Sequence, residues 1–281
     1  MLKNNFMKKL KDNLNKTILI VSAVSIITGC KVEPKQSLPS KNFEMVWNDE
    51  FEGDSGIAPN AAKWTYDIGT GQNGWGNNEL QTYTNNSKNV SLDGSGNLVI
   101  KAIKDGAGNY TSARVKTEGL FAQKYGKIEA RIKTPTGAGI WPAFWMLGNN
   151  IKNVNWPQCG EIDIMEQKGK FSNITYSSIH GPGYSGGQAI TTPYGLKNDR
   201  FDNDFNVYAV EWSENKIEFF VNNYLFKSIT PSNAPGEWVF NQEFFIIMNV
   251  AVGGSFVGLP NEYTPFPASM SIDYIRVYKE L

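Results

Sequence analysis

The sequence predicts an all-β protein, in which one β-sandwich of two curved antiparallel sheets with a concave cleft occupies residues 43–281. Three observations predict this fold: many short runs rich in β-branched and aromatic residues, turn-forming clusters between them, and the absence of any long run with helical periodicity. All-β sandwiches of about 200–250 residues commonly form one unit. We find no internal repeat, low-complexity tract or change of composition that would divide the chain.

The strand pattern is clearest in six runs, which are residues 97–103, 126–134, 207–213, 216–223, 244–252 and 270–278. Turn-like clusters separate such runs, and they include residues 93–97, 135–139, 213–216 and 231–237. The third and fourth runs are predicted to form a hairpin with its turn near Ser213–Asn215. Two packed sheets leave a concave outer face, which suits a long polymer.

The N-terminal part predicts export. A basic leader precedes the short apolar run Thr17–Cys30, which is too short for a comfortable membrane span and has the pattern of a secretory signal. Its end, ITGC, resembles a bacterial lipobox, which implies cleavage before Cys30 and lipidation of the thiol; an ordinary signal peptide or anchor is the alternative. We therefore expect a lipoprotein signal peptide over 1–29, a lipid-anchored flexible tether over 30–42, and a location at the outer membrane or cell surface.

The charges exclude one class of partner. The chain has 27 basic and 27 acidic side chains, mixed along its length, so the sequence predicts no nucleic-acid partner. Eight tryptophans accompany many glycines and asparagines. We expect most of the aromatic side chains in the core, whereas tryptophan planes exposed in a groove suit sugar rings.

Cysteine and histidine are scarce. Cys159 is the only thiol of the predicted domain, so it cannot form an intramolecular disulfide there. A reactive pair of Cys159 with His180, the only histidine, stays open, but a small buried apolar side chain is the favoured reading. One histidine also argues against a zinc site built from several imidazoles.

One glycine motif matches the spacing of a dinucleotide-binding site but lacks the secondary structure that such a site needs around it. Gly69, Gly71 and Gly74 have the spacing G-x-G-x-x-G. In a dinucleotide site this motif follows a strand and opens a helix. The flanking residues show no amphipathic helix, so we do not expect nucleotide binding.

The segment CGEIDIMEQ places Glu161, Asp163 and Glu166 among apolar residues. In a strand, alternation puts Glu161 and Asp163 on the cleft face, and Ile162 and Ile164 in the core. Strict alternation would turn Glu166 inward, where an isolated carboxylate is costly. A β-bulge near Ile164–Met165 would return Glu166 to the cleft. A helix fails, because the first two acids would point about 200° apart.

Three neighbouring carboxylates suit glycoside hydrolysis. Like charges raise the pKa of one carboxyl group, as a proton donor near neutral pH requires. Hydrolysis of a glycosidic bond uses one carboxylate as nucleophile or base and a second carboxylic acid as proton donor. A cation site and a solvated acidic edge remain the alternatives from the residues alone.

GEIDIME closely resembles the catalytic signature of glycoside hydrolase family 16, in the bulged form E-x-D-x-x-E of laminarinase-like β-1,3-glucanases, agarases and carrageenases. The resemblance extends over nearly all of the domain. Segments that resemble laminarinases lie at residues 47–53, 73–84, 112–117, 125–148, 155–166, 179–187, 205–222, 248–254 and 272–278. The resemblance implies a jelly roll of the concanavalin A-like type.

The same resemblance implies roles for single residues. Glu161 would be the nucleophile of a retaining reaction, Glu166 the acid/base, and Asp163 the helper between them. Further substrate contacts would come from Trp75, Asn77, Arg114, Trp141, Trp145, Trp156, His180 and Asn249. No catalytic cofactor is implied, but a structural Ca²⁺ away from the cleft is, at Glu50, Gly96 and Asp273. One departure is Phe256, where laminarinases commonly have tryptophan.

The sequence therefore predicts a lipid-anchored, monomeric, endo-acting glycosidase that cleaves β-1,3 bonds in laminarin-like β-glucans. One alternative is a relative acting on mixed-linkage glucan or a marine galactan, of the agarase or carrageenase type. Another is a non-catalytic surface glycan-binding protein. Retention of all three acids argues against that last alternative.

Overall fold

The computed structural model describes residues 36–281, and within them the chain forms seventeen strands and three short helical turns. The predicted signal peptide over 1–29, the lipidation of Cys30 and the first part of the predicted tether lie outside the described residues. The helical turns are η1 (Gly74–Asn78), η2 (Gly186–Gln188) and η3 (Pro231–Asn233). Among residues 36–281, no helix is long and apolar enough to cross a bilayer.

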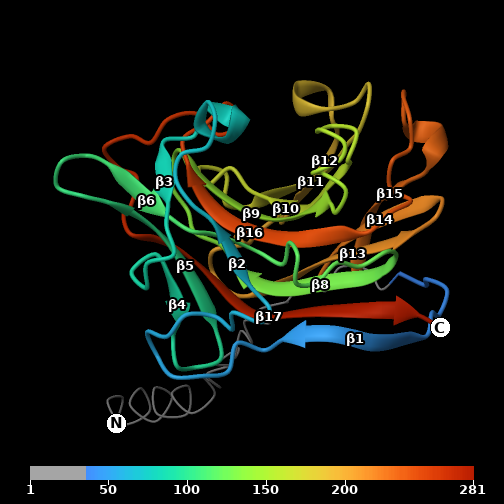
Figure 1. Ribbon diagram of the computed structural model, residues 1–281, viewed down its shortest axis with the longest axis horizontal. Coiled ribbons are helices and arrows are strands. Elements are labelled where there is room, and N and C mark those ends of the chain that lie inside the picture. Colours follow the sequence, from blue (N-terminus) through green and yellow to red (C-terminus); the bar gives the residue numbers. More distant parts are fainter. Residues whose placement is uncertain (1–35) are drawn as a thin grey trace, which may run out of the picture. The chain divides into compact units, whose positions relative to one another are not determined.

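The strands form two sheets that pack on each other (Figure 1). The larger sheet has the order β15 (Tyr224–Ile229), β14 (Lys216–Val221), β13 (Asn206–Ser213), β8 (Gly126–Lys133), β17 (Ala268–Glu280), β5 (Leu98–Lys104), β6 (Tyr110–Ser112) and β3 (Gln81–Tyr83), with β1 (Phe43–Asp49) on β17 and β4 (Val90–Leu92) on β5. The smaller sheet has the order β12 (Ile190–Gly195), β11 (Ile174–His180), β10 (Glu161–Glu166), β9 (Ile140–Gly148), β16 (Phe244–Val252), β7 (Arg114–Lys116) and β2 (Thr65–Asp67).

The predicted sandwich is confirmed. Each of the six runs forms a strand, namely β5, β8, β13, β14, β16 and β17, and β13 and β14 form the predicted hairpin by pairing Ser213 with Lys216. One detail differs from two purely antiparallel sheets, because the short strands β3 and β6 pair in parallel. This pairing could not be predicted, since strands of three residues carry too little alternation to reveal their direction.

The core lies between the sheets, and β16 shows why. Every residue of β16 is buried, because one side of the strand faces the larger sheet and the other is covered by side chains of the cleft. Phe244 meets Trp212 of the larger sheet in an edge-on contact with ring centroids 5.2 Å apart. Burial of one such ring contributes about 1.5–3 kcal/mol to the free energy of folding. The strands that carry the cleft therefore rest on a close-packed layer.

The glycine-rich segment does not form a nucleotide site. Gly74 begins η1, and the next residue, Trp75, has a left-handed backbone with φ of 54°. This turn lacks the long helix that a dinucleotide site requires at this point. Instead, it presents Trp75 and Asn77 to the cleft.

The segment before the first strand is attached to the sandwich. The side-chain amide of Gln36 donates to the carbonyl oxygen of Leu225 and accepts from its N–H, at 2.9 and 2.8 Å. Lys41 Nζ lies 2.6 Å from Glu211 and 3.5 Å from Glu218. The part of the predicted flexible tether that the structure describes is thus held against β15, β14 and β13.

Gly148 provides a test of the packing that positions the cleft. A Cβ on this residue would lie 1.9 Å from the carbonyl oxygen of Cys159, just before β10. We expect Gly148→Ala to lower the free energy of unfolding by about 1–3 kcal/mol, because neither main chain can move without disturbing the strands. Urea denaturation measures this change.

The control is Gly106→Ala, since a Cβ on Gly106 would meet no atom within 4 Å. Equal stability of the two variants would contradict the close approach of β9 and the residues before β10.

Candidate active site

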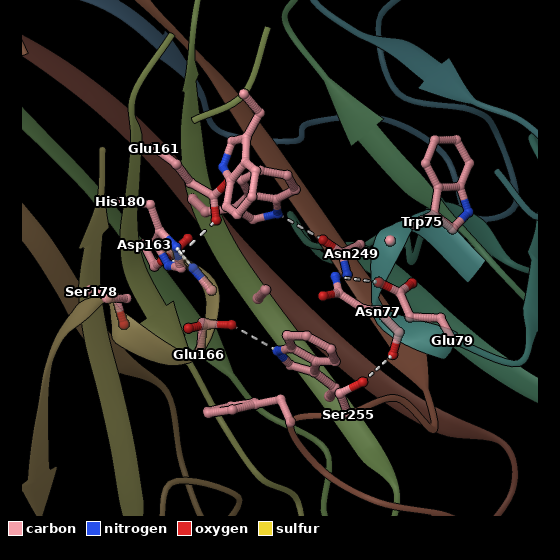
Figure 2. Close-up of a pocket in the computed structure, with 18 of the residues that line it drawn as sticks. Trp75, Asn77, Glu79, Glu161, Asp163, Glu166, Ser178, His180, Asn249 and Ser255 are labelled. Carbon is pink, nitrogen blue, oxygen red and sulfur yellow. Dashed lines mark hydrogen bonds and ion pairs between the residues drawn. The ribbon is translucent and has the colours of Figure 1, made fainter. Parts of the chain in front are cut away.

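The outer face of the smaller sheet carries a cleft of about 560 Å³. All eleven residues predicted for catalysis or sugar binding line it: Glu161, Asp163, Glu166, Trp75, Asn77, Arg114, Trp141, Trp145, Trp156, His180 and Asn249. Figure 2 shows the acids and His180 on one side of this cleft, and Asn249, Asn77 and Trp75 on the other. The structure thus brings the predicted residues together, while their roles in a reaction stay predictions.

The predicted bulge in β10 is confirmed. Asp163 pairs with Trp145 of β9, but Met165 pairs with the very next residue of that strand, so β10 contains one extra residue. The same shift appears against β11, between Asp163 and Glu166. Ile164 and Met165 both lie in the core. The extra residue therefore lets two apolar neighbours point inward and returns Glu166 to the cleft.

Two tryptophans hold the two glutamates separately. The indole N–H of Trp156 donates to Oε2 of Glu161 at 2.8 Å, and that of Trp141 donates to Oε1 of Glu166 at 3.0 Å. Trp156 comes from the loop before β10, whereas Trp141 comes from β9. Each glutamate therefore has an N–H donor of its own on one carboxylate oxygen.

The acids raise each other's proton affinity. Burial raises the pKa of Glu161 to about 8, and the charge of Asp163 adds to the effect. Burial and then Asp163 raise the pKa of Glu166 well above its ordinary value. Because the groups titrate together, the cluster retains protons near neutral pH. The N–H of Trp156 favours ionisation at Glu161, which leaves a proton for Glu166.

His180 has a polar neighbour at each ring nitrogen. Its Nε2 lies 3.0 Å from Oδ2 of Asp163, whose side chain is only 4% exposed. The main-chain N–H of Gly186 donates to Nδ1 at 3.1 Å. Burial lowers the pKa of the ring, but the carboxylates of Asp163, Glu161 and Glu166 outweigh it and raise the pKa to about 9. The Gly186 N–H acts in the opposite direction, because it can donate only to an unprotonated Nδ1.

Glu161, Asp163 and His180 offer ligand atoms that lie within 4.8 Å of one another, as a metal site would require. The surroundings of the histidine oppose this use. A neutral imidazole that binds a metal through Nε2 carries its proton on Nδ1, which normally donates to a carbonyl or carboxylate. Here Nδ1 faces the N–H of Gly186, so a proton there would meet another donor. The group fits acid chemistry better than metal binding.

A chain of hydrogen bonds organises the far side of the cleft. Trp145 Nε1 donates to Oδ1 of Asn249 at 2.8 Å, and the amide of Asn249 donates to the Tyr83 hydroxyl at 3.0 Å. Tyr83 in turn donates to Glu79 at 3.1 Å. Asn249 is 6% exposed, so it orients Trp145 more than it offers contacts to a ligand.

Arg114 lies between two aromatic rings. Its guanidinium carbon is 4.9 Å from the ring centre of Trp75 and 4.6 Å from that of Trp145, while its Nε lies 3.0 Å from Asp67. Such stacking fixes the direction of the guanidinium donors. The three predicted contacts of this side thus form one rigid wall.

Phe256 occupies the cleft wall near Glu166. Its ring centre lies 5.1 Å from that of Trp141 and 5.5 Å from that of Tyr176, and Lys168 Nζ lies 4.2 Å from its centre. The aromatic surface expected at this position is present, and it has no indole N–H. Any ligand contact that depends on such a donor is therefore absent from this side chain.

Cys159 is not a reactive thiol. It is fully buried, and burial and then the nearby Glu161 raise its pKa to about 11. A thiolate is therefore scarce at neutral pH. The interpretation as a small buried apolar side chain is confirmed.

Of the residues predicted for calcium, Asp273 lies on β17, Glu50 directly follows β1, and Gly96 lies in the loop between β4 and β5. Both carboxylate oxygens of Glu50 accept from Arg276 at 2.9 Å, and Asp273 pairs with Arg131. A Cβ on Gly96 would lie 3.9 Å from the carbonyl oxygen of Glu50, so these two positions adjoin. Because the carboxylates face arginines, the side chains as arranged do not form a cation site.

Several cleft residues were missed by sequence reasoning: Gly76, Glu79, Ala143, Leu147, Ser178, Gly186, Gly187, Ala189, Thr191 and Ser255. For Ser178 and Thr191, small polar side chains on neighbouring strands, no pattern separates cleft-facing from solvent-facing positions. Glu79 carried a usable signal, since it is the single acid within the segment 73–84 that resembles laminarinases.

Comparisons with known proteins agree with this geometry. The family model described as glycosyl hydrolases family 16 matches residues 75–276. A β-glucanase of Rhodothermus marinus is 36% identical over 283 residues, which cover 96% of each chain. A glucan endo-1,3-β-glucosidase A1 of Niallia circulans is 37% identical over 271 residues; the match covers 85% of this chain and 38% of that longer protein.

Solved structures give the same result. The laminarinase catalytic domain of Thermotoga maritima is 46% identical and superimposes with a TM-score of 0.80, over 86% of this chain and 100% of that domain. The family model covers well over half of the present sequence, and the bulged acid strand lies inside the matched region. The chain therefore belongs to the glycosyl hydrolases of family 16.

Proposed function

We propose that this protein is an endo-acting, retaining glycosidase that hydrolyses β-1,3-glucosidic bonds of laminarin-like β-glucans. One observation carries the proposal: two glutamates of one bulged strand face a cleft, and each is held by the N–H of a different tryptophan. The relatives named β-glucanase, glucan endo-1,3-β-glucosidase and laminarinase support the substrate class. An open cleft with side chains along both walls suits attack within a polymer.

The first step forms a bond to the enzyme. The carboxylate of Glu161 attacks the anomeric carbon while Glu166 gives its proton to the departing glycosidic oxygen, so the C–O bond breaks and a glycosyl ester of Glu161 remains. Asp163 raises the pKa of Glu166 and so favours the protonated form that this step needs. Trp156 donates a hydrogen bond to Glu161 and favours its ionised form.

The second step releases the sugar. Glu166, now a carboxylate, takes a proton from water, and the water oxygen attacks the anomeric carbon and displaces Glu161. Two displacements at one carbon leave its configuration unchanged. The Trp141 N–H stabilises Glu166 in its ionised state between the two steps.

The protein is further proposed to be an exported lipoprotein that acts as a monomer, anchored through Cys30 at the outer membrane or cell surface. The lipobox-like ITGC after a short apolar run supports this proposal. A structural Ca²⁺ near Glu50, Gly96 and Asp273 remains a prediction of the family resemblance. Since the two carboxylates pair with arginines, main-chain oxygens of these residues would have to hold the ion.

The decisive experiment measures the release of reducing sugar from laminarin, mixed-linkage β-glucan, agarose and carrageenan, beside the Glu161→Gln variant. We expect the highest rate with laminarin and no release by the variant. Activity on a galactan alone would keep the mechanism and overturn the substrate. Binding without release from any polymer would favour a glycan-binding protein instead.

We expect substitution of the two glutamates to have different effects on activity. Glu166→Gln should lower turnover of glucan by about 10²–10⁴-fold, because general acid catalysis is lost. It should affect an aryl β-glucoside oligosaccharide with an acidic leaving group much less, because that group needs no proton. Glu161→Gln should lose both activities. Equal losses on both substrates for Glu166→Gln would contradict the assignment of the proton donor.

Lipidation predicts a covalent label at one residue. In a bacterial host, the wild-type chain should incorporate labelled palmitate and sediment with membranes, whereas Cys30→Ala should remain unlabelled. Labelling of both chains to the same extent would contradict the anchor at Cys30.

Calcium predicts a change in thermal stability. An ion that binds only the folded protein raises the unfolding temperature, and a chelator lowers it again. Because main-chain oxygens would hold the ion, Asp273→Ala should leave this response in place. An unfolding temperature that does not respond to Ca²⁺ or to chelator would exclude the site.

A further inference from the structure

The single histidine of the chain has a defined partner on each ring nitrogen. Nε2 of His180 lies 3.0 Å from the Asp163 carboxylate, and Nδ1 accepts the N–H of Gly186 at 3.1 Å. An N–H donor can only point at a nitrogen that carries no proton. The hydrogen-bond network therefore assigns the ring's proton to Nε2 and makes the ring neutral.

The turn that carries Gly186 is built to present this N–H. Gln188 N–H donates to Ser185 at 3.0 Å, and Ala189 N–H donates to the carbonyl of Gly186 at 3.1 Å, which closes the short turn η2. Gly186 has a left-handed backbone with φ of 55°. The ring of Trp156 lies 4.0 Å from the position that a Cβ on Gly186 would take.

The charge of His180 matters to the acids. The titratable groups that face the ring are Asp163, Glu161 at 3.7 Å and Glu166, all on β10. Gly186 and Trp156, which contact the ring from other segments, bring no charge. A positive ring lowers the pKa of Glu161 and of Glu166. A charged His180 would thus draw the proton away from the group proposed to donate it.

We propose that Gly186 is a positioning residue for the reaction: its main-chain N–H occupies Nδ1 of His180 and holds the ring neutral, with its single proton on Nε2, the nitrogen that lies beside Asp163. His180 then lies beside Asp163 without adding a positive charge to the cleft. Glu166 keeps its proton until the glycosidic oxygen takes it. This inference rests on the proposed function for the role of Glu166, but the state of the ring does not depend on it.

Two physical effects compete at Nδ1. The three carboxylates favour a second proton on the ring, and their charges raise its pKa to about 9. A second proton would break the bond from Gly186 and leave two N–H donors facing each other in a largely buried place. An unmet buried donor is costly, so the turn resists protonation for as long as it keeps its conformation.

Nitrogen NMR of the ring tests the inference directly. Because His180 is the only histidine, the full-length chain labelled with ¹⁵N, purified without a histidine tag, gives one pair of ring signals. Between pH 6 and 8 we expect Nε2 to be protonated, Nδ1 to be unprotonated, and a scalar coupling to join Nδ1 to the amide nitrogen of Gly186. Two protonated ring nitrogens, or a proton on Nδ1, would overturn the proposal.

Gly186→Ala tests the role of the turn. A left-handed backbone is unfavourable for an alanine, so the turn should relax and withdraw its N–H. The ring should then take a second proton, and the alkaline limb of kcat/KM should move to lower pH by about one unit, because the pKa of Glu166 falls. The control is Gly108→Ala, a left-handed glycine in a turn outside the cleft lining, whose Cβ would meet no atom within 4 Å.

A second background separates positioning from simple loss of structure. In His180→Gln the side chain can still donate to Asp163 but cannot become charged. Adding Gly186→Ala to this variant should leave the alkaline limb in place. A shift of the same size in both backgrounds would overturn the proposal, because it would not pass through the imidazole. If no polymer is cleaved at all, the proposed function fails, and the NMR signals still decide the state of the ring.

Discussion

Mutual repulsion among three carboxyl groups on one face of one strand is the constraint on which the rest of the site depends. Glu161, Asp163 and Glu166 must share a cleft of limited volume, and none of them can turn into the apolar layer behind β10. Without further contacts, the three carboxyl groups would move apart and water would enter between them. The protein instead surrounds the acids with fixed donors, among which the N–H groups of Trp156 and Trp141 each serve one glutamate. The repulsion that remains is useful, since it keeps a proton in the cleft at a pH where an ordinary carboxyl group has none.

The sandwich makes this arrangement possible by holding both sides of the acid strand. On its inner side, the bulge sends Ile164 and Met165 into the core together, so apolar packing fixes the place where the strand changes its register. On either flank, β9 and β11 supply the partners of the acids, Trp141 from one and His180 from the other. A slip of one residue in β10 would bury a charge and expose an isoleucine. The register is thus specified from both faces at once.

The local parts of this arrangement could be predicted from the sequence, and the non-local parts could not. The spacing of the acids predicts the bulge, because burying a carboxylate is the only alternative within a regular strand. Alternation and turn clusters likewise predict six of the strands, which are β5, β8, β13, β14, β16 and β17. The bond from Gly186 to His180 has no such signal, since a main-chain N–H leaves no trace in the residue type that carries it. The chain from Trp145 through Asn249 to Glu79 joins segments more than 160 residues apart, so only the folded structure reveals that Asn249 orients a ring.

The contacts of Gln36 and Lys41 limit the distance between the catalytic domain and a lipid anchor at Cys30. If Cys30 holds lipid, the length of chain left between the anchor and the docked Gln36 is residues 31–35, which span at most about 18 Å when fully extended. A linker that short, attached at the edge of β15, allows the catalytic domain little rotation and keeps it within roughly one protein diameter of the bilayer. Under that condition the polymer has to reach the membrane. The rate of degradation would then depend on how often glucan chains contact the cell surface, and not on the diffusion of the enzyme.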